Sequence, residues 1–257
     1  MNADPARSKA SVQANWRHSG KFGPIRAILF DKDGTLVDFQ RTWGPAVHEV
    51  MWHLARHDRA AYERLAAVSR FVAAERRFLP DSPLIGEPTQ VFGALWAEAL
   101  SRTPSAEFFV EIDRLLRDAT TLHLAAIGDP KAVLTDLARW DYRIGMFTND
   151  PEATARAHAR KLGLEGILQF IAGYDSGFGA KPEPGPVLGF AKAVGVAPAE
   201  IVMVGDTVLD LIAARAAGAI AVGVLTGPAL AQTLAPHADA LIGSYTELPA
   251  WLPARSA

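Results

Sequence analysis

Four short polar clusters in this 257-residue chain carry side chains that could do chemistry together. Asp31 and Asp33 are two positions apart and follow the apolar run Ala27–Phe30. Two carboxylates this close repel each other, and a hard divalent cation such as Mg²⁺ relieves the repulsion. Asp206 follows another apolar run and could add a third carboxylate. Asp210 comes one helical turn later, where it could act through water or orient its neighbours.

The other two clusters suit an anion that sits beside such a cation. Thr148 and Asn149 follow the apolar run Ile144–Phe147, and Lys181 stands in the segment Ala180–Pro184. A hydroxyl, an amide, an ammonium group and backbone N–H groups at a helix start can stabilise the oxygens of a phosphoryl group. The chain has no cysteine, and no serine lies in a G-x-S-x-G elbow, so a carboxylate is the expected nucleophile and would form an acyl phosphate.

Apolar, strand-like runs alternate with helical patterns along much of the chain. This alternation predicts an α/β fold whose parallel, doubly wound sheet, a Rossmann-like core, is covered by helices on both faces. Ligand sites in such sheets lie beyond the carboxyl ends of the strands, so all four polar clusters are expected at one edge. The predicted strands are Ala27–Phe30, Ile144–Phe147, Phe170–Tyr174, Ile201–Val204, Ala219–Leu225 and Ala240–Ile242.

Local signals set the ends of the predicted core helices. Asp150 is expected to cap a helix that starts with Pro151 and stops at Gly163. A second helix is expected to stop at Gly195 and a third to end before Gly218. Walker-type and G-x-G-x-x-G phosphate loops are absent from the sequence, which argues against nucleoside triphosphate and dinucleotide sites.

One long stretch, from about Arg41 to His123, shows helical spacing only. It predicts an inserted, all-helical cap domain over residues 41–123, between a core formed by residues 23–40 and 124–257. Residues 1–22 are expected to form a loose N-terminal tail. The segment Leu79–Pro88 holds three prolines and a glycine and is predicted to be a loop between two helical pairs.

Composition narrows the functional classes. The formal net charge is −2, with 26 Lys+Arg against 28 Asp+Glu, so a strong basic field for nucleic acid or anionic lipid is missing. The sequence holds neither an apolar run of membrane-spanning length nor a signal-type start, and the absence of cysteine fits a reducing compartment. A cytoplasmic protein, a monomer or a homodimer, that acts on a small phosphorylated metabolite is expected.

The order and spacing of these clusters resemble the four motifs of the haloacid dehalogenase-like hydrolase superfamily, especially its phosphoglycolate phosphatase-like branch with an inserted helical cap. The resemblance spans about residues 25–245. The matching motifs are Asp31-Lys32-Asp33-Gly34-Thr35, Thr148-Asn149, Lys181-Pro182-Glu183-Pro184, and Gly205-Asp206 with Asp210.

The resemblance implies a Mg²⁺-dependent phosphatase of small phosphate monoesters, with a phosphoglycolate-like substrate as one candidate. Asp31 would be the nucleophile and Asp33 the general acid and base. Thr148, with Asn149, would bind phosphoryl oxygens, and Lys181 would neutralise charge on the nucleophile and the phosphate. The metal would be held by Asp31, the carbonyl of Asp33 and Asp206, with Asp210 in support. An acid at position 33 favours phosphoryl transfer over carbon–halogen cleavage, since a leaving halide needs no proton.

Lys32 departs from the family pattern, which has an apolar residue between the two aspartates. Because side chains alternate along a strand, Lys32 should point away from both aspartates, with at most an ion pair behind the site. Among the cap arginines, Arg41 is nearest the catalytic loop and could reach a substrate carboxylate. The tryptophans Trp43, Trp52 and Trp96 are expected to serve packing.

Three alternatives remain at this point. A sugar phosphomutase of the same superfamily would share every core residue. A phospho-accepting signalling receiver also has a doubly wound fold with an aspartate, a threonine and a lysine, but leaves the helical insertion without a role. A catalytically silent interaction protein is disfavoured because each expected reactive group is present.

Overall fold

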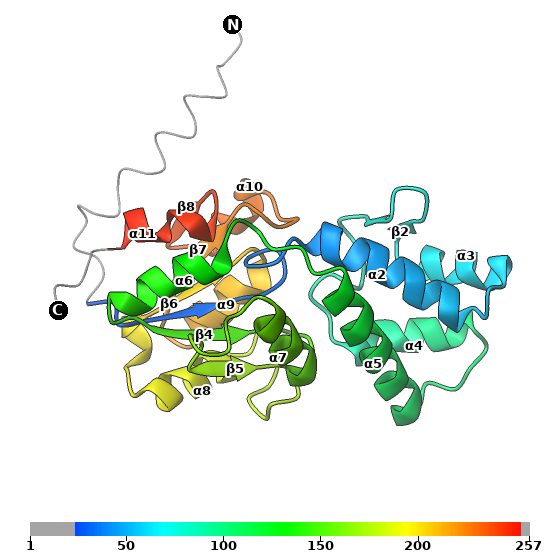
Figure 1. Ribbon diagram of the computed structural model, residues 1–257, viewed down its shortest axis with the longest axis horizontal. Helices are drawn as coiled ribbons and strands as arrows, with labels where there is room; N and C mark the ends of the chain where they lie inside the picture. Colours follow the sequence, from blue (N-terminus) through cyan, green and yellow to red (C-terminus); the bar gives the residue numbers. More distant parts are fainter. Residues whose placement is uncertain (1–23, 253–257) are drawn as a thin grey trace, which may run out of the picture.

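The computed structural model describes residues 24–252, so the predicted tail over residues 1–22 lies outside the described residues. Within this range the chain forms a central sheet flanked by helices, and a helical unit stands at one end of the sheet (Figure 1). No helix in the described range is long and apolar enough to cross a membrane.

The central sheet has six parallel strands in the order β5-β4-β1-β6-β7-β8. The first strand in the chain thus lies in the middle, and later strands are added to either side of it. This arrangement confirms the predicted doubly wound α/β core. The strands are β1 (Ala27–Phe30), β4 (Arg143–Phe147), β5 (Phe170–Ala172), β6 (Ile201–Gly205), β7 (Ile220–Val224) and β8 (Ala240–Ile242).

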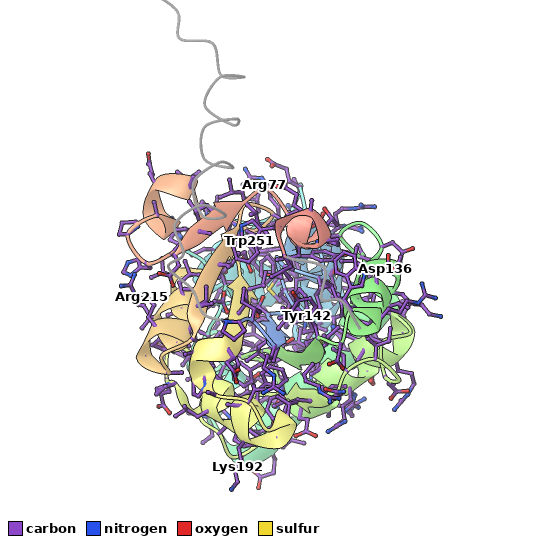
Figure 2. The ribbon with its side chains drawn as sticks, turned by 90° about the vertical axis from the view of Figure 1, so that its left-hand side faces the viewer. Arg77, Asp136, Tyr142, Lys192, Arg215 and Trp251 are labelled. Atoms are coloured by element: carbon purple, nitrogen blue, oxygen red, sulfur yellow. The ribbon has the colours of Figure 1, made fainter. Side chains whose placement is uncertain are left out.

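Alternation along the strands supplies a separate hydrophobic core to each face of the sheet. In β1, Ile28 and Phe30 face the core under α6, α7 and α11, while Ala27 and Leu29 face the core under α8 and α9. Figure 2 views the end of the sheet away from the helical unit and shows Tyr142 near the centre of this end of the molecule. The helices are α6 (Pro130–Arg139), α7 (Glu152–Lys161), α8 (Gly185–Val194), α9 (Val208–Ala216), α10 (Ala231–Leu234) and α11 (Leu248–Trp251).

The segment between β1 and α6 forms the helical unit, which we call the cap. It consists of α2 (Phe39–Leu54), α3 (Arg59–Val68), α4 (Thr89–Ala99) and α5 (Ala106–Leu122). Their apolar faces share one hydrophobic cluster that is distinct from the two sheet cores. The cap also contains an antiparallel pair, β2 (Phe71–Val72) with β3 (Arg77–Phe78), so the prediction of an all-helical cap was wrong for this segment. Two-residue strands are too short to produce a periodic signal.

The predicted helix stops agree with the structure, but one predicted start does not. Gly163 and Gly195 have φ of 70° and 68°, the left-handed conformation that ends a helix. Asp150, however, does not cap α7, which begins at Glu152. Asp175, from the loop after β5, accepts a hydrogen bond from the Glu152 N–H at 2.7 Å instead. The prediction of Asp150 as the N-cap was wrong because its carboxylate is engaged elsewhere, as described below.

Gly145 in β4 tests the packing of the sheet against α8. A Cβ at this position would lie 2.7 Å from the ring of Phe190 and 3.1 Å from Leu29 in the buried core. Gly145→Ala should therefore lower the free energy of unfolding by about 1–3 kcal/mol through overpacking. Gly166→Ala is the matched control, since a Cβ there meets nothing within 4 Å. Urea unfolding of both variants checks the prediction, and equal stabilities would contradict it.

Candidate active site

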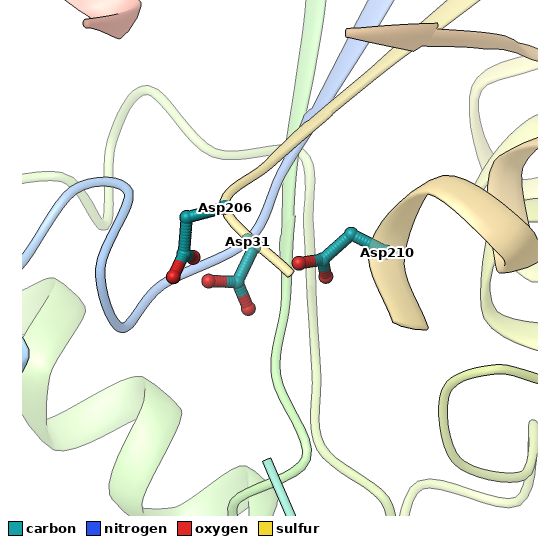
Figure 3. A group of neighbouring side chains, drawn as sticks. All are labelled: Asp31, Asp206 and Asp210. Atoms are coloured by element: carbon teal, nitrogen blue, oxygen red, sulfur yellow. The ribbon is translucent and has the colours of Figure 1, made fainter. Parts of the chain in front are cut away.

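Three aspartates from different parts of the chain converge at the carboxyl edge of the sheet (Figure 3). Asp31 follows β1, Asp206 follows β6, and Asp210 lies in the first turn of α9. One carboxylate oxygen from each lies within 4.8 Å of the others, and all three residues are buried. Such a cluster of oxygen ligands is compatible with a hard divalent cation.

Lys181 places a positive charge inside this acidic cluster. Its Nζ forms a buried ion pair with Asp31 Oδ1 and donates to Asp210 Oδ1 at 2.7 Å. The second oxygen of Asp210 accepts hydrogen bonds from the N–H of Thr207 at 2.9 Å and from its hydroxyl at 2.6 Å. Both oxygens of Asp210 are thus occupied, which suits a residue that orients Lys181 and supports the metal site rather than one that ligates directly.

The cluster contains more carboxylate groups than positive charges. Burial raises the pKa of the Asp31 carboxyl to about 7, and the carboxylates of Asp210 and Asp33 add to the effect while Lys181 opposes it. Burial and the neighbouring carboxylates also hold the pKa of Asp206 well above its usual value. Burial alone would lower the pKa of Lys181, but the two adjacent carboxylates raise it and keep the ammonium charged. One ammonium therefore faces an excess of carboxylates, and a divalent cation fits this donor set.

Close backbone approach shapes the pocket around Asp206. Thr35 donates its hydroxyl proton to Asp206 Oδ1 at 3.1 Å. Gly34 has φ of 80°, and a Cβ at this position would lie 2.2 Å from Asp206 Oδ2. Only glycine fits there, since a side chain would meet both backbone strain and the carboxylate. The Gly34-Thr35 pair of the first motif thus helps to hold the aspartate of the fourth.

Thr148 and Asn149 lie at the end of β4, in the wall of the same cavity. The Asn149 side chain accepts from the Lys181 N–H at 2.9 Å and donates to the carbonyls of Lys181, at 3.1 Å, and of Gly86, at 2.8 Å. Both ends of the amide are therefore engaged by backbone groups. The Asn149 side chain positions Lys181 and ties a cap loop to the core, while phosphate binding by Thr148 and Asn149 stays a prediction.

Asp33 belongs to a second network, which is built around Lys32. Lys32 is fully buried, and its Nζ pairs with Asp33 Oδ2 and, at 2.8 Å, with Asp150 Oδ2. The other oxygen of Asp33 accepts from the indole N–H of Trp43 in α2 at 2.8 Å. The expected ion pair of Lys32 is confirmed. The inference that Lys32 points away from both aspartates was wrong for Asp33, because the long side chain turns back toward it.

Lys32 gives Asp33 an environment opposite to that of Asp31. Burial alone would raise the pKa of Asp33, but the Lys32 ammonium and the Trp43 hydrogen bond lower it below its usual value. Burial raises the pKa of Asp150 to about 7, with Lys32 opposing and Asp33 reinforcing the shift. Lys32 thus favours an ionised Asp33, and Asp150 is the second partner of the Lys32 ammonium.

The cap closes over the site with residues that the sequence analysis left without a role. From the core the cavity is lined by the predicted site residues other than Asp210. From the cap it is lined by α2, the first turn of α4 and the loop before α4. Gly86 in that loop accepts the Asn149 hydrogen bond, and Gln90 donates to the Tyr174 hydroxyl at 2.8 Å. Arg41 is exposed and does not line the cavity. The three prolines predicted the loop, but its position over the site depends on how the cap folds.

Fold and site together define a class: doubly wound α/β enzymes that present a carboxylate cluster with a buried lysine at the carboxyl edge of the sheet, under a helical lid. The family profile for haloacid dehalogenase-like hydrolases matches residues 25–218. The phosphoglycolate phosphatase of Chromobacterium violaceum is 33% identical over 233 residues, which cover 87% of this chain and 95% of that protein. The phosphoglycolate phosphatase of Rhodospirillum rubrum is 30% identical over 237 residues, 88% of this chain and 90% of that protein.

A solved structure extends the likeness in fold. CbbY from Rhodobacter sphaeroides, in complex with phosphate, superposes with a TM-score of 0.64 at 22% identity and covers 87% of this chain and 96% of its own. The chain belongs to the haloacid dehalogenase-like hydrolase family, in its phosphoglycolate phosphatase-like branch. The predicted enzyme class, a phosphoric monoester hydrolase, is confirmed, and the signalling-receiver alternative is set aside.

The two partners of Lys32 lead to a stability prediction. Lys32→Met leaves Asp33 and Asp150 buried without their cation and should lower the free energy of unfolding by about 3–5 kcal/mol. The double variant Lys32→Met with Asp150→Asn should recover part of the loss, because one buried carboxylate remains in place of two. Lys192→Met, at an exposed position of α8, is the control and should change stability by less than about 0.5 kcal/mol. Denaturant unfolding measures these changes, and equal free energies of unfolding for Lys32→Met and Lys192→Met would disprove the role of Lys32.

Proposed function

We propose that this hydrolase is a Mg²⁺-dependent phosphatase that cleaves a small-molecule phosphate monoester through an aspartyl-phosphate intermediate. The observation that carries the proposal is the buried contact of Lys181 with Asp31 inside the cluster of Asp31, Asp206 and Asp210. It joins a nucleophilic carboxylate, a fixed positive charge and metal-compatible oxygens in one cavity. The name of the curated relatives makes phosphoglycolate the first substrate to test.

Asp31 is the nucleophile in this proposal. One of its oxygens attacks phosphorus, the bond from phosphorus to the alcohol oxygen breaks, and the phosphoryl group becomes bonded to Asp31. Lys181 neutralises charge on Asp31 and on the transferred phosphoryl oxygens, while the Thr148 hydroxyl donates a hydrogen bond to them. Mg²⁺, held by Asp31, the Asp33 carbonyl and Asp206, would neutralise negative charge on the carboxylates and the phosphoryl group.

Asp33 handles the proton in both steps. The negative charge of a bound phosphoryl group raises the pKa of a neighbouring carboxyl, so Asp33 can hold a proton in the complex and give it to the departing alcohol oxygen. Asp33 is then ionised, the state that Lys32 favours, and takes a proton from the water that attacks the aspartyl phosphate. Cleavage returns Asp31 and releases inorganic phosphate. Trp43 restricts rotation of the Asp33 carboxylate through its hydrogen bond to Oδ1.

The cap loop that covers the cavity suits this chemistry because it limits access of water to the acyl phosphate. Opening would have to break the hydrogen bonds from Asn149 to Gly86 and from Gln90 to Tyr174. The cytoplasmic location and the choice between monomer and homodimer stay predictions. A sugar phosphomutase, the alternative within the superfamily, would return the phosphoryl group to a sugar and release little inorganic phosphate.

Removal of the nucleophile tests the first step. Asp31→Asn should lower kcat for release of inorganic phosphate from an aryl phosphate by about 10³-fold or more, because an amide cannot form the acyl phosphate. Asp118→Asn, at an exposed position of α5, is the matched control and should retain wild-type activity. Equal activity of the two variants would refute the nucleophile assignment.

Binding of Mg²⁺ should be coupled to proton release. In the metal-free protein the pKa of Asp31 is raised to about 7, so at pH 7 about half of the molecules carry a proton there. A bound cation favours the carboxylate, which should displace at least about half a proton per ion and tighten binding as the pH rises from about 6 to 8. Titration calorimetry in two buffers of different ionisation enthalpy measures the release. Asp206→Asn should weaken Mg²⁺ binding, and binding without proton release would contradict the scheme.

A further inference from the structure

The wall that faces the leaving group is uncharged apart from a single acid. The alcohol part of a substrate must lie on the cap side of the phosphoryl group, next to Asp33, which protonates its oxygen. From the cap the cavity is lined by Phe39 and Trp43 of α2, by Phe92 of α4, and by Leu84 and Glu87 of the loop before α4. The rings of Phe39 and Trp43 stack with centroids 5.9 Å apart and an interplanar angle of 24°.

The positive charges near the site are already matched by carboxylates. Of the described residues, Lys181 is the only cationic one that lines the cavity, and it pairs with Asp31 and Asp210. Lys32 lies behind the lining and pairs with Asp33 and Asp150. A carboxylate on the leaving group would therefore meet no unpaired cationic side chain on the cap side of the cavity, as far as the described residues line it.

We infer that the cap wall selects phosphate monoesters of small, uncharged, largely apolar alcohols and disfavours those whose leaving group carries a carboxylate, such as phosphoglycolate. This inference rests on the proposed phosphatase function. An anion buried against Phe39, Leu84 and Phe92 loses its hydration without gaining a partner. At the edge of the cavity it would also meet the like charge of Glu87. A neutral alcohol meets neither cost and gains contact with the stacked Phe39 and Trp43 rings.

The closed cap leaves a narrow cavity over the catalytic residues. Its volume is about 50 Å³, which is room for a few water molecules. The loop that carries Leu84 and Glu87 is held down by the hydrogen bond from Asn149 to Gly86. A Cβ on Gly86 would lie 3.3 Å from Leu209 of the core, so the loop approaches the core closely at this point. The closed cap therefore sets both the volume and the apolar character of the wall.

The test compares two substrates that differ in charge but hardly in shape: 2-phosphoglycolate and its amide, 2-phosphoglycolamide. With the full chain and Mg²⁺, kcat/KM for phosphate release should be at least about tenfold higher for the amide, since 1.4 kcal/mol of selective destabilisation already gives tenfold. Equal values, or a preference for phosphoglycolate, would overturn the inference. Release of phosphate from neither substrate nor from phenyl phosphate would instead overturn the proposed phosphatase function.

Variants of Glu87 show whether the cap wall is the cause. Glu87 is exposed, so Glu87→Gln and Glu87→Lys should fold normally. Their ratio of kcat/KM for amide over acid should fall stepwise, because the first variant removes a like charge and the second adds a cation. Glu98→Lys, an equal change of charge at an exposed position of α4 outside the cavity, should leave the ratio unchanged. A ratio that does not respond to Glu87, or that responds equally to Glu98, would show that the wall does not select by charge.

Discussion

The site depends on one electrostatic constraint: several carboxylates are held out of water at a single edge of the sheet, and each must have a partner. Burial makes an unpaired carboxylate costly, and it raises the pKa of both Asp31 and Asp206. Lys181 supplies part of that charge through Asp31 and Asp210. The close approach of Gly34 and the hydroxyl of Thr35 shape the space around Asp206. The cluster holds more carboxylates than cations, which makes it compatible with a divalent cation.

Two lysines divide the acidic groups into two networks with different properties. Lys181 lies between Asp31 and Asp210, and Lys32 lies between Asp33 and Asp150. The pKa of Asp31 is raised, whereas that of Asp33 is lowered, although the two residues are separated by only one position. The two carboxyl groups therefore lie in opposite electrostatic environments: burial beside other carboxylates dominates at Asp31, whereas the Lys32 ammonium and the Trp43 hydrogen bond dominate at Asp33. A family member with an apolar residue at this position lacks the Lys32 ammonium. Another group would have to balance the charge of Asp33 there.

The cap contributes to the chemistry as well as to selection. Trp43 packs against Phe39 and also donates a hydrogen bond to Asp33, so α2 links the wall of the cavity to this carboxylate. Asn149 connects the third motif to the cap, because one side-chain amide holds the Lys181 backbone and the Gly86 carbonyl together. The cap is thus hydrogen-bonded to the same segment that carries Lys181.

Much of this arrangement follows from local sequence rules. Short continuous apolar runs predict the six strands, and glycines in the left-handed conformation end the helices. Parallel pairing brings Asp31, Lys181 and Asp206 to one edge. These features depend on neighbouring residues and on the handedness of crossovers, so they can be recognised without coordinates. The general helical character of the cap segment follows from its spacing in the same way.

Other features depend on contacts between residues far apart in the chain. Asp150 looked like a helix cap, but its carboxylate pairs with Lys32 while Asp175 takes the capping position. Neither contact can be recognised from neighbouring residues, because each partner comes from another segment of the chain. The same holds for the Leu79–Pro88 loop, whose prolines predict a turn but not its place over the cavity. Spacing along the chain therefore determined the sheet and the set of reactive groups, whereas the partner of each charge and the wall seen by the substrate arose from packing between distant segments.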